Sequence, residues 1–237
     1  MNQSRFFKTT LLLTTLVAFS HCSDDSESVA TDSGTNPEPT TTGNPEPDES
    51  MSFFLTSVGP GDGANLGGLD GADAHCTTLA EAAGTSGQTW RAYLSTTGAG
   101  GVNAIDRIGS GPWINANGVT VATSTANLLA ADENNITKET AITESGDIVN
   151  GRGDTPNRHD IITGTTNSGG PSDAAEDTTC NNWTSNDAGS ALVGHHDREG
   201  GGSDPESWTN AHPSAGCSQA DLISTAGDGL FYCFATN

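Results

Sequence analysis

The 237-residue sequence has few positive charges, with 8 Lys and Arg residues against 30 Asp and Glu residues. This balance excludes binding to nucleic acid, because phosphate backbones would be repelled. It also excludes a basic membrane-binding surface, so a membrane can be a partner only through a lipid anchor. Aromatic residues are scarce as well, at 5% of the chain. The length suits one domain with appendages and leaves little room for two full cores.

Common catalytic and metal-binding motifs are missing from the sequence. No Cys-x-x-Cys occurs, so neither a zinc ribbon nor a thioredoxin-type site is supported. Gly-x-Ser-x-Gly, His-Glu-x-x-His and Walker sequences are absent too. The glycine-rich segment 59–64 resembles a dinucleotide loop only superficially, because Asp62 would repel a pyrophosphate. We therefore predict that the protein is not an enzyme, and we keep an uncharacterised hydrolase as an alternative.

The N-terminus has the pattern of an export signal. Arg5 and Lys8 precede the apolar run Leu11–Phe19, which is too short to span a bilayer. Cys22 follows, and a cysteine at this boundary resembles a bacterial lipoprotein box, although the residues one and three positions before it are not the usual ones. We predict a signal peptide over residues 1–21 and lipidation of Cys22, with ordinary cleavage as the alternative. Either way the protein is exported, as an outer-membrane or cell-surface lipoprotein or in secreted form.

Residues 22–50 have the composition of a flexible stalk. The segment contains no aromatic residue and one sizeable aliphatic residue, Val29, and it repeats Asn-Pro-Glu-Pro at 36–39 and 44–47. Such a segment cannot bury enough apolar surface to offset the entropy of ordering it. We predict a disordered, acidic, Pro- and Thr-rich stalk that ends at a folded domain over residues 51–237.

The domain pattern predicts short strands, long loops and one helix. Asp70 is a candidate N-cap for a helix that runs to Ala83 and is closed by Gly84. The hairpin signal at 113–121 contains Asn117-Gly118, which suits a tight turn with positive φ. No stretch after residue 140 has helical periodicity. The remaining expected strands are 52–58, 89–95, 161–162, 191–193 and 230–234.

The cysteines predict two disulfides. With Cys22 assigned to the signal boundary, four cysteines remain, an even number in an exported chain. Four cysteines allow three pairings, and free buried thiols are the alternative. These cysteines are Cys76, Cys180, Cys217 and Cys233.

Segments 67–76 (Gly-Gly-Leu-Asp-Gly-Ala-Asp-Ala-His-Cys) and 90–95 (Trp-Arg-Ala-Tyr-Leu-Ser) resemble the opening of the endostatin domain of certain collagens. Segments 163–165, 180–184, 216–217 and 230–234 continue the likeness, which spans most of residues 52–237. The sequence is similar, more closely still, to a group of bacterial exported lectin-like proteins.

The resemblance implies an α+β, C-type-lectin-like fold. This fold has a twisted, mixed or antiparallel sheet, one or two helices, long ordered loops and chain ends that meet. The resemblance also implies two nested disulfides, Cys76–Cys233 and Cys180–Cys217.

The ligand sites of these families do not carry over. Endostatin's zinc site uses histidines near that domain's N-terminus, and here no histidine precedes His75 in the domain. Its heparin surface is an arginine cluster, whereas residues 51–237 hold 22 acidic and 6 basic residues. The Glu-Pro-Asn, Gln-Pro-Asp and Trp-Asn-Asp signatures of calcium-dependent sugar binding are absent. The fold therefore suggests a binding module by association alone.

Histidines form the best candidate metal cluster in the sequence. His195, His196 and Asp197 are consecutive, and His212 and His159 are candidates to join them. In a regular strand His195 and His196 point to opposite faces, so at most one of them shares a site with Asp197. Polar loop histidines without a metal are the alternative. The metal is therefore unknown at this point.

Two other loops offer oxygen ligands or a binding motif. Calcium is a candidate cofactor in loops 151–154 and 202–206, although neither has EF-hand spacing and a solvated acidic surface is the favoured interpretation. Arg152, Gly153 and Asp154 match the tripeptide that animal integrins bind. We keep adhesion to host integrins as an alternative function and a tight turn as its structural explanation.

The leading functional hypothesis is a recognition module that binds a glycan or a protein at the cell surface. The binding surface would lie on loops between about residues 115 and 213. Trp208 is a candidate to stack on a sugar, although a core position or a loop anchor is the favoured interpretation. Trp90 and Trp183 are expected in the core. The polar candidates are Asn181, Asn182, Asp197 and Asp204.

Overall fold

The computed structural model of the protein describes residues 50–173 and 175–236. The signal peptide over 1–21, the lipidated Cys22 and the stalk up to residue 49 lie outside these residues, so their predictions stay predictions. Among the described residues, no helix is long and apolar enough to cross a membrane.

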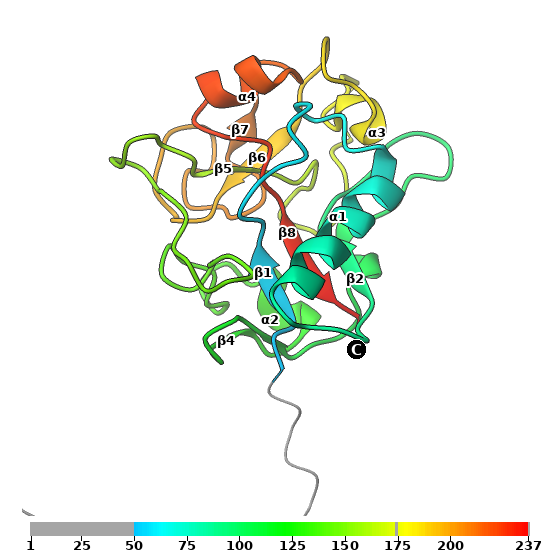
Figure 1. The fold of residues 1–237 in the computed structure, drawn as a ribbon. Helices are drawn as coiled ribbons and strands as arrows, with labels where there is room; N and C mark the ends of the chain where they lie inside the picture. Colours follow the sequence, from blue (N-terminus) through cyan, green and yellow to red (C-terminus); the bar gives the residue numbers. More distant parts are fainter. Residues whose placement is uncertain (1–49, 174, 237) are drawn as a thin grey trace, which may run out of the picture. The chain divides into compact units, whose positions relative to one another are not determined.

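The first sheet joins the two ends of the domain. Its strands are β1 (Phe53–Leu55), β8 (Tyr232–Ala235) and β2 (Trp90–Ala92), in the order β1-β8-β2 and with antiparallel pairing throughout. Cys233 lies opposite Phe54 on one side and Ala92 on the other. Figure 1 shows β8 between its two partners. The expected meeting of the two ends is confirmed.

Helix α1 (Gly68–Ala82) packs against this sheet and is bonded to it. The Cys76–Cys233 disulfide joins helix and central strand across a Cα–Cα distance of 5.7 Å. The prediction of Asp70 as the N-cap is wrong, because the N-cap is Gly67, three residues earlier, in a left-handed conformation. Asp70 instead lies in the first turn, where its charge complements the helix dipole.

The second disulfide, Cys180–Cys217, completes the nested pairing that the resemblance implied. Cys180 opens α3 (Cys180–Trp183), in which all four residues have positive φ, between 49° and 68°. This short helix is therefore a left-handed turn, which is rare outside glycine. The Asp177 carboxylate accepts hydrogen bonds from the N–H groups of Thr179 and Asn181 and stabilises it.

Two local predictions need correction. In the hairpin of β3 (Trp113–Ile114) and β4 (Thr120–Ala122), Gly118 has positive φ but Asn117 does not. Hydrogen bonds from Asn115 and Gly118 show a three-residue loop in place of a two-residue turn. Helix α4 (Gln219–Ser224) contradicts the expectation of no helix after residue 140. Its six residues are too few to show a helical period in the sequence.

The smaller elements complete the chain order. A single 3-10 turn precedes the hairpin, and one short helix follows it. These are η1 (Ala104–Arg107) and α2 (Thr125–Leu129).

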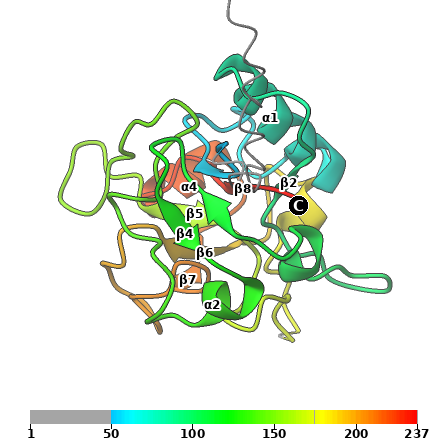
Figure 2. The ribbon, with the colours of Figure 1, turned by 90° about the horizontal axis from the view of Figure 1, so that it is seen from below.

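The third sheet contains β5 (Asp160–Ile162), β6 (Leu192–His195) and β7 (His212–Pro213) in that order, with antiparallel pairing. Its register places Asp160 opposite His195 and Val193 opposite His212. In Figure 2 these strands lie next to one another, away from α1. Because alternate residues of a strand share a face, Asp160, His195 and His212 lie on one face of this sheet.

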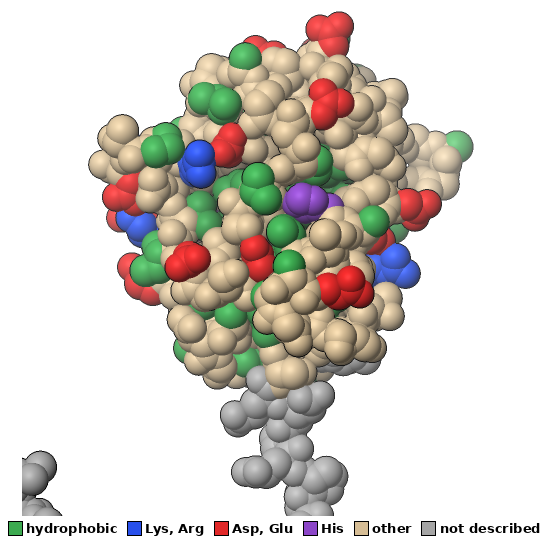
Figure 3. All heavy atoms as spheres, in the orientation of Figure 1, with side chains coloured by type: hydrophobic (Ala, Val, Ile, Leu, Met, Phe, Trp, Pro, Cys, Tyr) green, Lys and Arg blue, Asp and Glu red, His purple; other side chains and the backbone are tan. Residues whose placement is uncertain are grey.

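The core has two parts, which β8 separates. Cys233 and Ala235 pack into one cluster with Trp90 and Trp183, and Tyr232 and Phe234 pack into the other. The expected core positions of Trp90 and Trp183 are confirmed. The protein is thus an α+β protein with small antiparallel sheets and two disulfides. Its visible surface in Figure 3 carries many acidic and few basic side chains.

Candidate metal centre

Asp160 is a buried carboxylate without a hydrogen-bond donor. Its side chain is 1% exposed, and neither carboxylate oxygen has a hydrogen-bond partner among the described residues. The backbone holds it in place, because Asp160 N–H donates to the carbonyl of Ala226 and β5 pairs with β6. A buried carboxylate is costly unless a cation or several donors compensate it. The surroundings of Asp160 must therefore supply that compensation.

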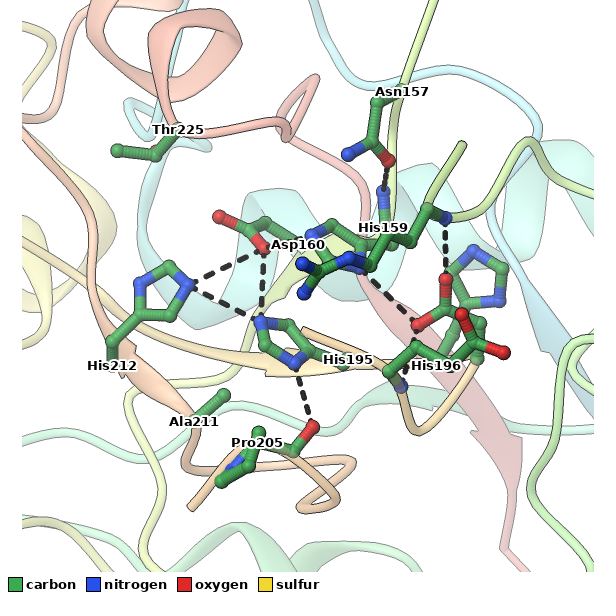
Figure 4. Close-up of polar contacts among 12 residues, drawn as sticks. Asn157, His159, Asp160, His195, His196, Pro205, Ala211, His212 and Thr225 are labelled. Atoms are coloured by element: carbon green, nitrogen blue, oxygen red, sulfur yellow. Dashed lines mark hydrogen bonds and ion pairs between the residues drawn. The ribbon is translucent and has the colours of Figure 1, made fainter. Parts of the chain in front are cut away.

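Three imidazoles surround one oxygen of this carboxylate (Figure 4). Asp160 Oδ1 lies 3.3 Å from His159 Nε2, 3.3 Å from His195 Nε2 and 3.6 Å from His212 Nε2. His195 Nε2 and His212 Nε2 are 3.2 Å apart. The rings of His159 and His195 are stacked, with centroids 4.3 Å apart. The four side chains thus direct four potential ligand atoms toward one region.

The other nitrogen of each imidazole faces an acceptor. His159 Nδ1 lies 3.2 Å from the carboxylate of Asp197, and His195 Nδ1 lies 2.8 Å from the carbonyl of Pro205. His212 Nδ1 lies 3.1 Å from the carbonyl of Pro213. Because carbonyls and carboxylates only accept, each Nδ1 carries the proton wherever the Nε2 atom gives its lone pair to a metal ion. In the neutral imidazoles the Nε2 atoms around Asp160 then have free lone pairs.

The protonation preferences of the neighbouring groups follow from their contacts. Burial opposes a charge on His195, but the Asp160 carboxylate and the Pro205 carbonyl outweigh burial and raise the pKa of His195. Burial also opposes a charge on Asp197. Hydrogen bonds from His159 and from the N–H groups of Arg152 and Glu199 nevertheless hold its pKa well below the usual value. The centre therefore contains two negative carboxylates next to imidazoles, and a cation bound there would be stabilised by both.

The distances match the edges of a small coordination tetrahedron. With metal–nitrogen bonds of 2.0–2.1 Å, neighbouring ligand atoms of a tetrahedral zinc ion lie about 3.3–3.4 Å apart. Four of the six ligand-to-ligand distances at this centre are 3.2, 3.3, 3.3 and 3.6 Å, and the group whose ligand atoms all lie within 4.8 Å of one another contains His159, Asp160 and His195 but not His212. The acceptors at each Nδ1 are also typical of metal sites, where they orient the imidazole and fix its tautomer. The arrangement can therefore hold a first-row transition metal ion.

A glycine-rich loop covers the outer side of the centre. A Cβ atom at Gly200 would lie 2.2 Å from His195 Cε1, and one at Gly202 would lie 2.4 Å from the carbonyl oxygen of Ala211 and 3.1 Å from His212 Cδ2. Both positions therefore need glycine for close approach to the imidazoles or their strand. His212 is 25% exposed, whereas His195 is fully buried. The centre thus has a buried side and an outer side.

The sequence predicted part of this cluster. His159, His195 and His212 come together as candidates, whereas His196 points elsewhere and lies 3.4 Å from the carbonyl of Asn150. Burial lowers the pKa of His196 to about 4. Asp197 hydrogen-bonds His159 Nδ1 and accepts from the N–H groups of Arg152 and Glu199. The opposite directions expected for His195 and His196 are confirmed.

Sequence analysis missed Asp160. It directly precedes the apolar pair Ile161–Ile162, and a His-Asp pair at the start of a buried strand is the signal that was available. Among the described His, Cys, Asp and Glu side chains, one group of three or more is close enough to share an ion, and it consists of His159, Asp160 and His195.

The predicted sugar-binding residues are largely occupied by internal contacts. Trp208 is 4% exposed and packs against Tyr93 and Tyr232, so the prediction that it stacks on a sugar is wrong. Asn182 Oδ1 accepts from the N–H of Thr97, and Asp204 accepts from Asn167 Nδ2.

The remaining two polar candidates are Asn181 and Asp197. Asn181 is exposed, but its amide donates to Thr184 Oγ1. Asp197 has a buried side chain at the metal centre. Of the five predicted ligand-binding residues, Asn181 is thus exposed, and the buried Trp208 cannot serve as an aromatic contact on the surface.

The Arg152-Gly153-Asp154 tripeptide lies on an exposed loop. Arg152 and Gly153 are exposed, but Asp154 Oδ2 accepts from Lys138 Nζ at 2.6 Å and from the N–H of Gly151 at 2.8 Å. The Lys138 ammonium and the Gly151 N–H hold the pKa of Asp154 below its usual value. Adhesion through this tripeptide stays a prediction, and an integrin would have to compete with Lys138 for the carboxylate.

Calcium in loops 151–154 and 202–206 also stays a prediction. The carboxylates of Asp154 and Asp204 there already accept hydrogen bonds from Lys138 and Asn167.

Comparison with known proteins adds no assignment. No protein-family model matches the chain, and no curated protein matches it.

Proposed function

We propose that the domain binds a first-row transition metal ion, with zinc as the preferred ion. The ligand atoms are His159 Nε2, Asp160 Oδ1 and His195 Nε2, and His212 Nε2, which lies 3.6 Å from Asp160 Oδ1 and 3.2 Å from His195 Nε2, is the candidate for the fourth ligand. The observation that carries this proposal is the buried Asp160 carboxylate, which has no donor among the described residues and faces three imidazole nitrogens. A metal cation compensates the carboxylate and accepts the nitrogen lone pairs at the same time.

The donor set favours zinc over calcium or magnesium. Imidazole suits zinc, copper, iron and nickel, whereas calcium and magnesium prefer oxygen ligands. Zinc accepts both imidazole nitrogen and carboxylate oxygen as ligands, and it is usually four-coordinate and tetrahedral. With His212 as the fourth ligand the site is closed, and closed sites bind metal structurally without activating water. We keep the expectation that the protein is not an enzyme.

The wider role that we propose is recognition at the cell surface by a C-type-lectin-like domain. Nested disulfides, the pairing of β1 with β8 and the long ordered loops support this fold. Disulfides form and persist in oxidising compartments, which supports export. In this interpretation the metal stabilises the sheet and loops that carry the recognition surface, and the ligand is a glycan or a protein.

The metal proposal is tested by zinc titration of the full exported chain after treatment with a chelator. We expect one zinc ion per chain with a Kd below about 1 µM at pH 7.5. The affinity should fall between pH 7 and 5, because ligand imidazoles must be neutral. His195→Gln should abolish binding.

The matched control is His75→Gln. His75 lies on α1, where its Nε2 contacts the carbonyl of Val58, and it is not part of the cluster. Zinc binding to this variant should equal that of the unmodified chain. Absence of bound zinc, or an equal loss of affinity in both variants, would overturn the proposal.

A further inference from the structure

The exposed loop Gly151–Arg158 is attached to the metal centre at both of its ends. His159 and Asp160 follow the loop directly in the chain. At its beginning, the N–H of Arg152 donates to Asp197 Oδ2 at 2.6 Å. Asp197 in turn accepts from His159 Nδ1 through Oδ1 at 3.2 Å. One carboxylate thus joins a metal ligand to the start of the loop.

Asp197 is a buried, hydrogen-bonded carboxylate and not an exposed surface acid. Its side chain is 3% exposed, and Oδ1 also accepts from the N–H of Glu199 at 3.1 Å. A Cβ atom at Gly151 would lie 2.6 Å from Asp197 Oδ2, so the loop approaches the carboxylate closely at a glycine. The loop and Asp197 therefore fit each other in the observed conformation.

His159 stands between two carboxylates that require its proton at different nitrogens. Its Nδ1 faces Asp197 and its Nε2 faces Asp160 Oδ1 at 3.3 Å. A neutral imidazole has one proton, so it can donate to only one of them. A proton on Nε2 satisfies Asp160 and leaves the lone pair of Nδ1 against the Asp197 carboxylate.

We propose that metal binding fixes the proton of His159 on Nδ1 and thereby, through Asp197, fixes the Arg152-Gly153-Asp154 loop. This inference rests on the proposed metal centre and adds a regulatory role to it. A metal bound at Nε2 excludes the proton from that nitrogen, so the imidazole must donate from Nδ1 to Asp197. Asp197 is then held where it accepts the N–H of Arg152. Without the metal the proton can also occupy Nε2, where it satisfies Asp160, and the lone pair of Nδ1 then repels the Asp197 carboxylate and weakens its hold on the loop.

The loop is the part of this coupled system that a partner can reach, because Arg152 and Gly153 are exposed. Hydrogen bonds from Asp154 N–H to the Gly151 carbonyl and from Asn150 Nδ2 to the Pro156 carbonyl give it a defined shape of its own. The hydrogen bond from the Arg152 N–H to Asp197 holds the loop in its position next to the third sheet. A partner that binds the exposed Arg152 and Gly153 would therefore bind the metal-loaded protein more tightly than the metal-free one.

The test is amide hydrogen exchange at residue resolution by NMR on the full exported chain at pH 8, where free imidazole is neutral. We expect zinc to slow exchange of the Arg152 amide at least about tenfold, as expected when a local opening is suppressed. The Tyr93 amide donates to the Tyr232 carbonyl in the first sheet and serves as an internal reference that zinc should leave unchanged. Nitrogen-15 shifts of His159 should report protonated Nδ1 in the zinc form.

Asp197→Asn separates coupling from metal binding. This variant should still bind one zinc ion, about 10–100-fold more weakly, as for other loss of outer-shell support. At saturating zinc its Arg152 amide should exchange as fast as in the metal-free protein. Asp204→Asn, a carboxylate change outside the centre, should retain the zinc effect.

The outcomes distinguish this inference from the metal proposal. Zinc binding at one equivalent with an unchanged Arg152 exchange rate would overturn the coupling and leave the metal site intact. Equal changes at Arg152 and Tyr93 would also overturn it, because they would indicate global stabilisation. Absence of zinc binding would overturn both. If a variant does not fold, the exchange rates of the Arg152 and Tyr93 amides in zinc-loaded and metal-free unmodified protein still test the coupling.

Discussion

Two buried aspartates show how differently this domain treats negative charge. Asp73 on α1 is 6% exposed, and both of its oxygens accept from Arg107 Nη2 at 2.8 Å. Arg91 Nη1 and the N–H of Ala92 complete its contacts. Asp160 in β5 is more deeply buried, but no donor in the described part of the chain hydrogen-bonds its carboxylate. One charge is compensated by arginine side chains and a backbone N–H, and the other faces three imidazole nitrogens, between which we propose a metal ion.

The shortage of basic residues explains this difference. The domain has six Lys and Arg residues, and Asp73 engages two of them. Lys138 pairs with Asp154 and Arg158 pairs with Asp228. In so acidic a domain, the three histidines around Asp160 and the metal ion that we propose would compensate a further buried carboxylate without another Lys or Arg residue. The following predictions test whether the two aspartates differ in this way.

Asp73→Ala should have the largest effect on folding. Removing one member of a buried ion pair leaves Arg107 without its partner, and such losses cost about 3–5 kcal/mol of unfolding free energy. The loss, measured by urea denaturation, should be the same with and without zinc. Arg91→Ala is the control, because Arg91 is 41% exposed and its pair should contribute less than about 1 kcal/mol.

Asp160→Asn should act through the metal. In the unmodified protein, zinc at 100–1,000 times its Kd should raise the unfolding free energy by about 2.7–4.1 kcal/mol. The variant should lose this increase. Its metal-free stability should equal or exceed that of the unmodified chain, because an amide donates to the imidazoles without a buried charge. A large loss of metal-free stability would show that Asp160 resembles Asp73 after all.

His212→Ala should weaken zinc binding less than His195→Ala. His212 lies on the outer side of the centre and is partly exposed, so water can replace its nitrogen. We expect a rise in Kd of about 10–100-fold, which corresponds to about 1.4–2.8 kcal/mol. Calorimetric titration of both variants checks this order. Equal losses of affinity in the two variants would show that water cannot replace the His212 nitrogen.

Asn181→Gly should have the smallest effect and the opposite sign. Asn181 lies in the left-handed turn with φ at 54°, where glycine has no steric penalty. We expect a gain of about 0.5–1 kcal/mol in unfolding free energy, partly offset by the greater freedom of the unfolded chain. Asn182→Gly is the informative contrast. It should destabilise the protein, because Asn182 Oδ1 accepts from Thr97 and Thr179.

Much of the fold was predictable from local pattern. The strands at 53–55 and 90–92, helix α1 and the 113–121 hairpin follow from periodicity and turn residues. The disulfide pairing followed from the family resemblance, since the cysteines alone allowed three pairings. The helix α4 and the start of α1 were missed because caps and short elements carry weak periodic signals.

The metal centre was predictable only in part. Alternation along a strand separated His195 from His196 correctly. The register that places Asp160 opposite His195 joins residues 35 positions apart, and no local pattern encodes it. The burial of Trp208 likewise depends on the distant Tyr93 and Tyr232. Local rules therefore identified candidate ligands, and long-range packing selected among them.

The central position of β8 dictates the order in which this protein is assembled. β1 and β2 both pair with β8, and Cys76 lies 157 positions before its partner Cys233. Neither strand can complete its ladder until residues 232–235 are present to pair with it. Four cysteines allow three pairings, and wrong bonds formed before β8 is in place have to be reshuffled. A disulfide isomerase should therefore accelerate oxidative refolding to the native pairing.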